Sequence, residues 1–527
     1  MEKIIELENN LTDFSPEDLI QIESAHLSLD RISKQIDILT NGIAKTVLDR
    51  PATSGDGIIT LTYSQYSDFA AAFDQNKQSL KLQKFVPASG AATRMFKFLS
   101  EFLAEYDLEN ESINAFMNRK NANELRVFLA GKKEFPFYDQ VYEMLAQNHP
   151  DFREWERSKR SYHFIKTLID AEFLDFANKP KGILPFHKYK SHIATPVEEH
   201  LAEAIRYSCG SDGKVNLHFT VTEDHKVHFE KIVEQARQIF ETQACGVLDV
   251  TYSFQDPATD TIAVTPDNKP FRDKKGKLVF RPGGHGALIQ NLNNLDADVI
   301  FIKNIDNVIQ DHVDTIAFYK KALGGIMIES QNRIFECLKK LDQNPSAVDL
   351  DEISDVIREK LNMNVSEDFR NFTTEYKIQY IKRLLDRPIR VCGMVKNEGE
   401  PGGGPFWVRD QNGILSLQIV ESSQVDLKEQ RQADIFAKST HFNPVDLVCG
   451  IKNYRGEKFD LTQYVDHRSG FIVDKTKDGK PLKSYELPGL WNGAMAKWIT
   501  LFVEVPLITF NPVKTVNDLL KSAHQPQ

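Results

Sequence analysis

The stretch "ADVIFIKNIDNV", residues 297–308, decides the fold class of this chain. Residues 299–302 form a nearly continuous apolar run, which is typical of a strand in a parallel sheet that is buried on both faces. Asp306 follows the strand almost at once. Because ligands in open α/β sheets sit at the carboxyl ends of the strands, the stretch predicts an α/β fold with a carboxylate at the ligand-binding edge, where it could hold Mg²⁺.

A second stretch, "LQKFVPASGAATRMFKFL" (82–99), predicts a strand, a turn of small residues and a helix. Such a turn exposes backbone N–H groups at a helix N-terminus, where the helix dipole favours an anion. Arg94 adds a positive charge one turn into the segment. The pattern therefore predicts an anion-binding element.

The third stretch, "FRPGGHGALIQNL" (280–292), places three glycines and a histidine within five positions, just before an apolar-periodic segment. Glycines this dense indicate that the backbone bends sharply or comes close to something. A glycine-rich turn before a helix is more often structural than ligand-binding, and a lone aspartate after a strand is usually a cap. Three such elements in chain order nevertheless suggest a nucleotide site. The Walker pattern is absent, which excludes a P-loop NTPase.

The composition of the chain limits the classes of partner that it could bind. The chain has 527 residues, 41% of them hydrophobic and 27% charged, with a formal net charge of −10. It is therefore typical of a soluble globular protein, and the charge argues against nucleic acid as a partner but not against a small anion. The five cysteines are far apart, which favours a reducing compartment over a disulfide framework and makes zinc unexpected. His218, His225 and His228 lie close in sequence, but the pattern is not that of a zinc site.

The chain shows no pattern of a targeting or membrane segment. The start, "MEKIIELENN", is acidic and lacks an apolar core, so we expect no signal peptide. The most apolar stretch, 490–510, contains Lys497, Glu504 and Pro506, and we interpret it as a buried turn and a core strand. We expect a cytoplasmic protein.

These stretches together resemble the sugar-nucleotide pyrophosphorylases, nucleotidyltransferases of the GT-A type. "PASGAATRM" (87–95) is similar to their first signature, and "PGGHG" (282–286) with "FIKNIDN" (301–307) resembles the paired motifs of the branch that makes UDP-sugars. Supporting resemblances follow in the family's order: "KPKGILPF" (179–186), "FTVTEDH" (219–225), "SFQDP" (253–257), "LSLQIVESSQV" (415–425) and "TFNPVKTVNDLL" (509–520). The chain also resembles a bacterial family known as the DUF4301 domain.

The resemblance implies a GT-A or Rossmann-like three-layer α/β sandwich with a mixed, mainly parallel central sheet. Residues 1–79 are expected to form a helical N-terminal region. Residues 80–527 are expected to form the catalytic domain, with a helical insertion at about 98–178. In the family this insertion is absent, since the P-K-G motif normally follows the first turn closely.

The resemblance also implies roles for individual residues. The first turn (Ser89, Gly90, Ala91, Ala92, Thr93 and Arg94) would wrap the nucleotide phosphates. Gln255 and Gly284 would contact the base, Gly283 would bind the nucleotide, and His285 would pack close to the nucleotide or the sugar. Lys181 would reach the α-phosphate, Lys514 would hold the sugar phosphate and Asp306 would bind Mg²⁺. The implied reaction joins a nucleoside triphosphate, with UTP favoured, to a sugar 1-phosphate and releases pyrophosphate.

Two departures from the family pattern leave alternatives open. Ala92 stands where the family has a second glycine, which is tolerable only if φ is negative and the phosphate does not press on that Cα. The long insertion leaves Lys97 as an alternative to Lys181. A non-catalytic nucleotide- or sugar-phosphate-binding protein is therefore the second hypothesis, and a metal-dependent glycosyltransferase is the third. The base, the sugar and the oligomeric state are not indicated.

Overall fold

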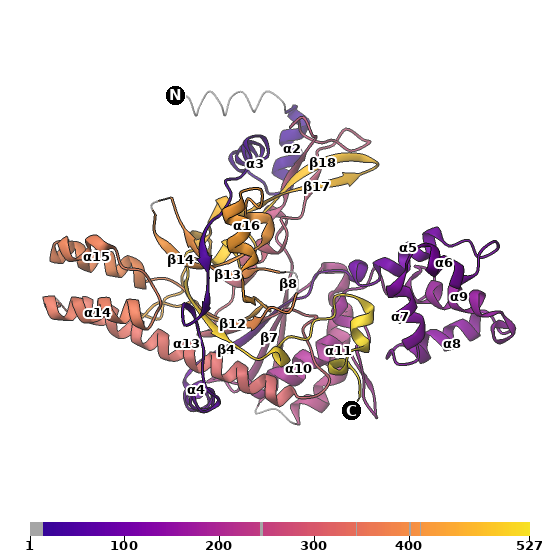
Figure 1. Ribbon diagram of the computed structural model, residues 1–527, viewed down its shortest axis with the longest axis horizontal. Coiled ribbons are helices and arrows are strands. Elements are labelled where there is room, and N and C mark those ends of the chain that lie inside the picture. Colours follow the sequence, from indigo (N-terminus) through magenta and orange to yellow (C-terminus); the bar gives the residue numbers. More distant parts are fainter. Residues whose placement is uncertain (1–13, 243–245, 344, 400–401, 412, 527) are drawn as a thin grey trace. The chain divides into compact units, whose positions relative to one another are not determined.

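The computed structural model describes residues 14–242, 246–343, 345–399, 402–411 and 413–526 (Figure 1). The stretch 1–10, from which no signal peptide was expected, lies outside these residues. Internal contacts divide the chain into two compact units. Unit 1 comprises residues 1–76, 255–302 and 321–507, and unit 2 comprises residues 77–254, 303–320 and 508–527.

Unit 2 contains a parallel three-stranded segment of sheet. Strand β4 (Leu82–Pro87) pairs with β7 (Lys214–Thr220), which pairs with β8 (Val247–Ser253). Helices α10 (Pro196–Tyr207) and α11 (Glu223–Glu241) pack against these strands. Six of the seven residues of β7 are buried, as expected for a strand covered on both faces. A short hairpin, β5 (His187–Lys188) with β6 (Ile193–Ala194), precedes α10.

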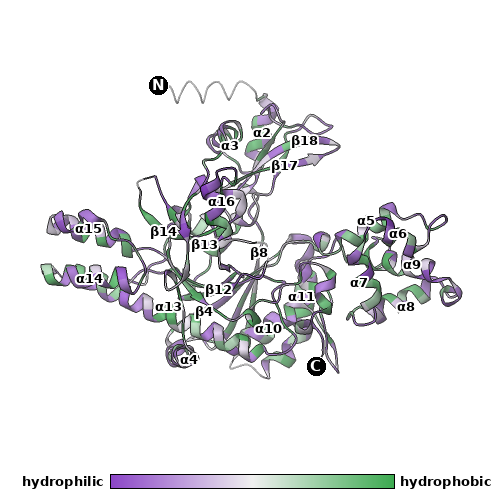
Figure 2. Cartoon of the chain, viewed as in Figure 1, coloured by the Kyte–Doolittle hydropathy of each residue, from purple (hydrophilic) through white to green (hydrophobic). Residues whose placement is uncertain are grey.

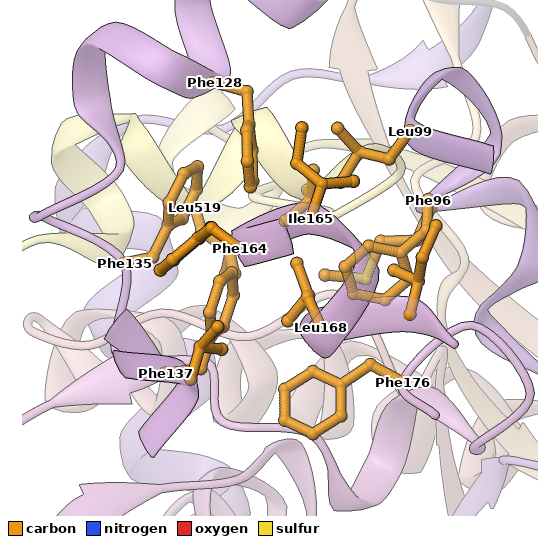
Figure 3. Close-up of a cluster of buried hydrophobic side chains, with 14 of the residues drawn as sticks. Phe96, Leu99, Phe128, Phe135, Phe137, Phe164, Ile165, Leu168, Phe176 and Leu519 are labelled. Carbon is orange, nitrogen blue, oxygen red and sulfur yellow. The ribbon is translucent and has the colours of Figure 1, made fainter. Parts of the chain in front are cut away.

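Unit 2 has five helices in the stretch where a helical insertion was predicted, at about 98–178. The stretch contains α5 (Lys97–Glu105), α6 (Ile113–Arg119), α7 (Asn123–Gly131), α8 (Tyr138–Asn148) and α9 (Arg157–Ile169). Phenylalanines fill its core, and Leu519 from the C-terminal segment packs among them (Figure 3). The insertion therefore shares one core with residues 513–519.

Unit 1 contains the other strands of the mainly parallel sheet. Strand β12 (Ile389–Lys396) runs parallel to β19 (Ile499–Glu504), and β19 continues through β3 (Gly57–Ile59) to β2 (Thr53–Ser54). On its other edge β12 pairs antiparallel with β16 (Asp446–Gly450) and β15 (His441–Phe442). Strand β11 (Val299–Lys303) belongs to the same sheet, and all five of its residues are buried. The predicted α/β class with a mixed, mainly parallel sheet is thus confirmed.

Two smaller antiparallel sheets complete unit 1. One has the order β10 (Phe280–Arg281), β9 (Thr261–Val264), β18 (Lys480–Glu486) and β17 (Phe471–Lys477). Helix α3 (Leu29–Asn41) packs on it. The other has the order β1 (Val47–Pro51), β13 (Gly404–Arg409) and β14 (Leu415–Val420).

The N-terminal region holds helices α2 (Pro16–Ser24), α3 and α4 (Tyr63–Asn76), but also strands β1 to β3. The expectation of a mostly helical region missed these strands. They are short, and β1 and β3 pair with strands more than 350 residues away, so no local pattern marks them.

Helices form the rest of unit 1. They include α12 (Ile289–Asn293), α14 (Ala347–Glu359), α15 (Thr374–Leu385) and α16 (Gln430–Ala437), and the long α13 (Val313–Leu341) begins in unit 2. Figure 2 shows hydrophobic and hydrophilic residues mixed along α14 and α15, as expected for helices with one packed face.

Three smaller expectations also have outcomes. No helix among the described residues is both long and apolar enough to cross a membrane. His218 is a packed residue, and its two ring nitrogens hydrogen-bond to the hydroxyls of Thr251 and Ser253. The cysteine spacing favoured a reducing compartment over a disulfide framework, yet Cys209 is disulfide-bonded, because the fold can join cysteines that lie far apart in sequence.

Candidate functional site

The turn after β4 is fastened to the segment that carries Lys181. Ala91 forms a β-bridge with Pro180, and the Ala92 N–H donates to the Lys179 carbonyl at 2.9 Å. Residues 92–94 then form a 3-10 turn that leads toward α5. Gly90, Ala91, Thr93 and Arg94 are exposed, and Ser89 is half-buried. The turn therefore presents an open, polar and positively charged surface.

Ala92 points the other way, into the protein. It is fully buried and packs in the core of the helical insertion, and its φ is not in the positive region. The methyl group of Ala92, which stands where a glycine was expected, therefore packs in the core of the insertion. The steric objection to an anion at this turn does not apply in this structure.

Lys181 and Asp306 form an ion pair beside the turn. The Lys181 Nζ donates to Asp306 Oδ2 at 2.7 Å and to the Val513 carbonyl at 2.7 Å. Their side chains are 14% and 19% exposed, so both are accessible but largely surrounded by protein. Two residues 125 positions apart in sequence are thus brought into contact.

The segment that carries Lys514 is fixed to the same two places. The Val513 N–H donates to the Asp306 carbonyl at 3.0 Å, and the Val516 N–H donates to the Met95 carbonyl at 3.0 Å. Lys514 lies between these two bonds and is exposed. The structure therefore brings together the first turn, Lys181, Asp306 and Lys514, all within unit 2.

Two residues that hold this arrangement were missed in the sequence. Asn307 is 2% exposed; its Oδ1 accepts the Asn511 N–H at 2.8 Å and its Nδ2 donates to the Thr509 carbonyl at 3.3 Å. Asp518 accepts the backbone N–H groups of Lys514 and Thr515 at 2.9 and 2.7 Å. The Thr515-x-x-Asp518 spacing is a capping-box signal that could have been recognised.

Arg94 and Lys514 have no ion-pair partner among the described residues, and the Lys514 Nζ lies 5.8 Å from the Phe510 ring centroid. Lys97, the alternative phosphate lysine, pairs instead with Glu101 on its own helix at 3.5 Å. Uncompensated cations next to backbone N–H groups favour a multiply charged anion.

The glycine-rich turn in unit 1 is approached by the protein's own chain. A Cβ at Gly283 would lie 2.6 Å from the Thr259 carbonyl oxygen, and one at Gly286 would lie 2.1 Å from the Pro488 carbonyl oxygen. Gly284 has a φ of +74°, which disfavours any other residue. Packing and backbone conformation therefore account for the three glycines, and their contact with a nucleotide stays a prediction.

Gln255 and His285 lie near this turn within unit 1. The Gln255 Nε2 donates to the Thr259 hydroxyl at 3.3 Å. The His285 Nδ1 accepts the Leu490 N–H at 3.1 Å, and its ring stacks on Trp491 at 4.4 Å. Burial lowers the pKa of His285 to about 4, so the ring is neutral near pH 7 and carries its proton on Nε2.

His285 lines a polar cavity of about 480 Å³ in unit 1. Its other polar residues include two cations, Lys45 and Arg468, and two carboxylates, Glu421 and Glu486. Such a mixture of donors and acceptors suits a hydroxylated ligand. A larger cavity, of about 810 Å³, touches the same turn through Gly286 and Ala287.

No group of three or more His, Cys, Asp or Glu side chains that could hold a metal occurs in the described part of the chain. Asp306 alone therefore supplies one carboxylate. A fully protein-bound metal site does not fit these residues, whereas a hard cation shared between one carboxylate and ligand phosphates does.

Comparisons with known proteins identify one family and several solved structures of low sequence identity. The family model described as "Domain of unknown function (DUF4301)" matches residues 15–525. Among solved structures, the chain is similar to the uridine diphosphate N-acetylglucosamine pyrophosphorylase of Trypanosoma brucei, with 13% identity, a TM-score of 0.48, and coverage of 98% of this chain and 80% of that one. It is also similar to the UDP-glucose pyrophosphorylase of Leishmania major, with 11% identity, a TM-score of 0.42, and coverage of 95% and 77%. No curated protein matches the chain.

Proposed function

The chain belongs to the DUF4301 family, and from the geometry of unit 2 we propose that it is a nucleotidyltransferase that joins a nucleoside triphosphate to a sugar 1-phosphate. One observation carries the proposal. Lys181 and Asp306 meet at 2.7 Å on a frame of backbone hydrogen bonds that also holds the 89–94 turn and Lys514. Three cations and one carboxylate thereby surround one open turn.

The first turn would bind the triphosphate. The backbone N–H groups of residues 89–91, the Thr93 hydroxyl and the Arg94 guanidinium would contact the phosphate oxygens. Arg94 would face the β- and γ-phosphates, and Lys181 the α-phosphate. Fixed donors of this kind neutralise phosphate charge without reorganisation. Gly90 has no atom within 4 Å of the position of an added Cβ, so the phosphates can approach its Cα.

Asp306 would hold Mg²⁺, which commonly takes one or two carboxylates and completes its shell with substrate phosphates. When bound, Mg²⁺ would neutralise charge on the phosphate oxygens. The Lys181 ammonium, which the Asp306 carboxylate and the Val513 carbonyl fix at 2.7 Å each, would hold the α-phosphate beside that carboxylate.

The reaction needs positioning and charge more than acid–base chemistry. A phosphate oxygen of the sugar 1-phosphate, held by Lys514, attacks the α-phosphorus in line. A new oxygen–phosphorus bond forms, the bond to the β-phosphate oxygen breaks, and pyrophosphate leaves with the charge. Because the nucleophile is already an anion, no general base is required. Arg94 and Lys181 stabilise the charge on the leaving and bridging oxygens.

The sequence resemblance assigns further roles to residues of unit 1. Gln255, Gly283 and Gly284 would contact the base, for which uracil is favoured by the sequence resemblance. The neutral His285 can donate from Nε2 to a sugar or nucleotide oxygen, and the polar cavity beside it offers carboxylates and cations to sugar hydroxyls.

A pyrophosphate-release assay tests the proposal. The chain is incubated with Mg²⁺, each of four nucleoside triphosphates and a panel of sugar 1-phosphates. We expect release that needs one triphosphate and one sugar phosphate together. Lys181→Met, which keeps the length of the side chain but removes the charge, should lower kcat by at least a hundredfold.

Lys97→Met is the matched control, because Lys97 is exposed and pairs with Glu101. We expect its kcat to match that of the wild type. Equal losses in the two variants would count against the assignment of Lys181. Nucleotide binding without turnover by any sugar phosphate would instead indicate a binding protein on this fold.

A further inference from the structure

A small pocket in unit 1 is built around Arg387, where α15 ends and β12 is about to begin. It has a volume of about 90 Å³. Four chain segments line it: residues 362–364, residues 384–387, residues 414–417 and residues 496–500. None of these residues takes part in the nucleotide site proposed above.

Arg387 has no carboxylate partner among the described residues. Its Nε donates to the Leu384 carbonyl at 2.9 Å, at the end of α15, where the helix dipole also favours a cation. The Nη1 and Nη2 groups make no hydrogen bond in the described structure. Burial lowers the pKa of Arg387 to about 10, and only the phenols of Tyr464 and Tyr380 oppose this. Arg387 is half-buried, so its charge is partly withdrawn from water without a carboxylate to balance it, which favours an anion beside it.

Two further donors line the same pocket. Trp498 is 3% exposed, and its indole Nε1–H has no acceptor in the described structure. The Ser416 Oγ accepts from the Gln418 Nε2 at 3.0 Å, so its own O–H remains free to donate. An unsatisfied buried donor is rare in native proteins and calls for a partner.

A second guanidinium, that of Arg390, is hydrogen-bonded to Thr500, which lines the pocket. Arg390 is fully buried; its Nε donates to the Thr500 hydroxyl at 2.9 Å and its Nη1 to the Trp491 carbonyl at 2.6 Å. Its Nη2 has no acceptor, and no ion pair of Arg390 occurs in the described part of the chain. Thr500 itself lines the pocket. The local charge is therefore positive and uncompensated.

We propose that this pocket binds a small oxyanion, a phosphate or carboxylate group, with the Arg387 guanidinium as its principal contact. The planar fork of arginine suits two oxygens of one such group. The Ser416 hydroxyl and the Trp498 indole N–H supply donors of different orientation. The pocket is several times the roughly 10–15 Å³ that one water needs, which suits a single oxyanion group rather than a whole nucleotide.

Calorimetric titration of the full chain with inorganic phosphate, and separately with succinate, tests the site. All proteins carry Arg94→Ala, so that anion binding at the 89–94 turn is not counted, and ionic strength is held constant with chloride. Arg387→Met is compared with Arg383→Met, a control on the same helix in which an exposed arginine is lost. We expect the parent and the control to bind at least one of the two anions saturably, and Arg387→Met to bind it at least tenfold more weakly.

The two titrants distinguish a phosphate group from a carboxylate. Melting temperatures give a second readout: without anion, Arg387→Met should be at least as stable as its parent, because a half-buried cation without a carboxylate partner has been removed. Equal responses of all three proteins to both anions would show a general salt effect and overturn the proposal. If Arg387→Met does not fold, Trp498→Phe and Arg387→Lys replace it, and unchanged anion binding in both would equally overturn the site.

Discussion

Replacement of Gly286 by alanine tests whether the glycine-rich turn is shaped by the protein's own backbone. The added Cβ would lie 2.1 Å from the Pro488 carbonyl oxygen and 2.9 Å from the Leu487 carbonyl oxygen. Both are backbone atoms, so no side-chain rotation can relieve the clash. Overpacking in a well-packed site costs about 1–3 kcal/mol, and we expect the upper end, about 3 kcal/mol, because a main-chain segment must move.

Urea unfolding followed by tryptophan fluorescence measures this loss. Three of the four tryptophans, Trp407, Trp491 and Trp498, lie in unit 1, so their signal reports the unit that contains Gly286. Gly90→Ala is the matched control, because no atom lies within 4 Å of its added Cβ. We expect its unfolding free energy to stay within about 0.5 kcal/mol of the wild type. A Gly286→Ala variant that is as stable as the wild type but binds nucleotide more weakly would contradict this prediction. It would show that Gly286 is needed for ligand binding rather than for packing.

Three more substitutions test other contacts in unit 2. Leu519→Ala should cost about 2–5 kcal/mol in the unfolding free energy of unit 2, because Leu519 is fully buried in the core of the insertion; a loss below about 1 kcal/mol, measured by the fluorescence of Trp155, would contradict the shared core. Burial lowers the pKa of His218 from 6.5 to about 4, so as the pH falls the proton binds the unfolded state before the folded state. Between pH 7 and pH 4 the wild type should therefore lose about 3 kcal/mol of unfolding free energy that His218→Gln does not lose. Urea midpoints at the two pH values check this, and a difference that does not change with pH would count against it. Arg94→Ala should weaken nucleoside triphosphate binding at least tenfold while Lys97→Ala leaves it unchanged, as measured by equilibrium titration; equal effects would remove the assignment of Arg94.

Strands with strong local patterns could be predicted from the sequence. The run 299–302 is apolar throughout because the strand is buried on both faces. The composition of the 82–99 segment alone predicts a strand, a turn and a helix. Strands β1 to β3 could not be predicted, because their stability comes from partners such as β13 and β19 that are remote in sequence. Local propensity carries no information about such pairing.

The candidate site shows the same division. Residue types suited to phosphate, such as Arg94, Lys181 and Lys514, could be selected by their pattern and their resemblance. The contact that joins Lys181 to Asp306 could not be foreseen, because it depends on the Val513 segment pairing with Asp306 and on the insertion core beneath Ala92. The glycine turn was expected to lie against a nucleotide, but the closest atoms to Gly283 and Gly286 are backbone carbonyls, which sequence cannot distinguish from a ligand.

Nucleotide affinity shows whether Asp306, Lys181 and the 89–94 turn form one site for a metal-bound nucleotide. Nucleoside triphosphate is titrated into the wild type and into Asp306→Asn, with Mg²⁺ and with a chelator. We expect Mg²⁺ to tighten nucleotide binding to the wild type at least tenfold and to have little effect on Asp306→Asn. An equal effect of Mg²⁺ on both proteins, or no nucleotide binding to the wild type, would contradict it.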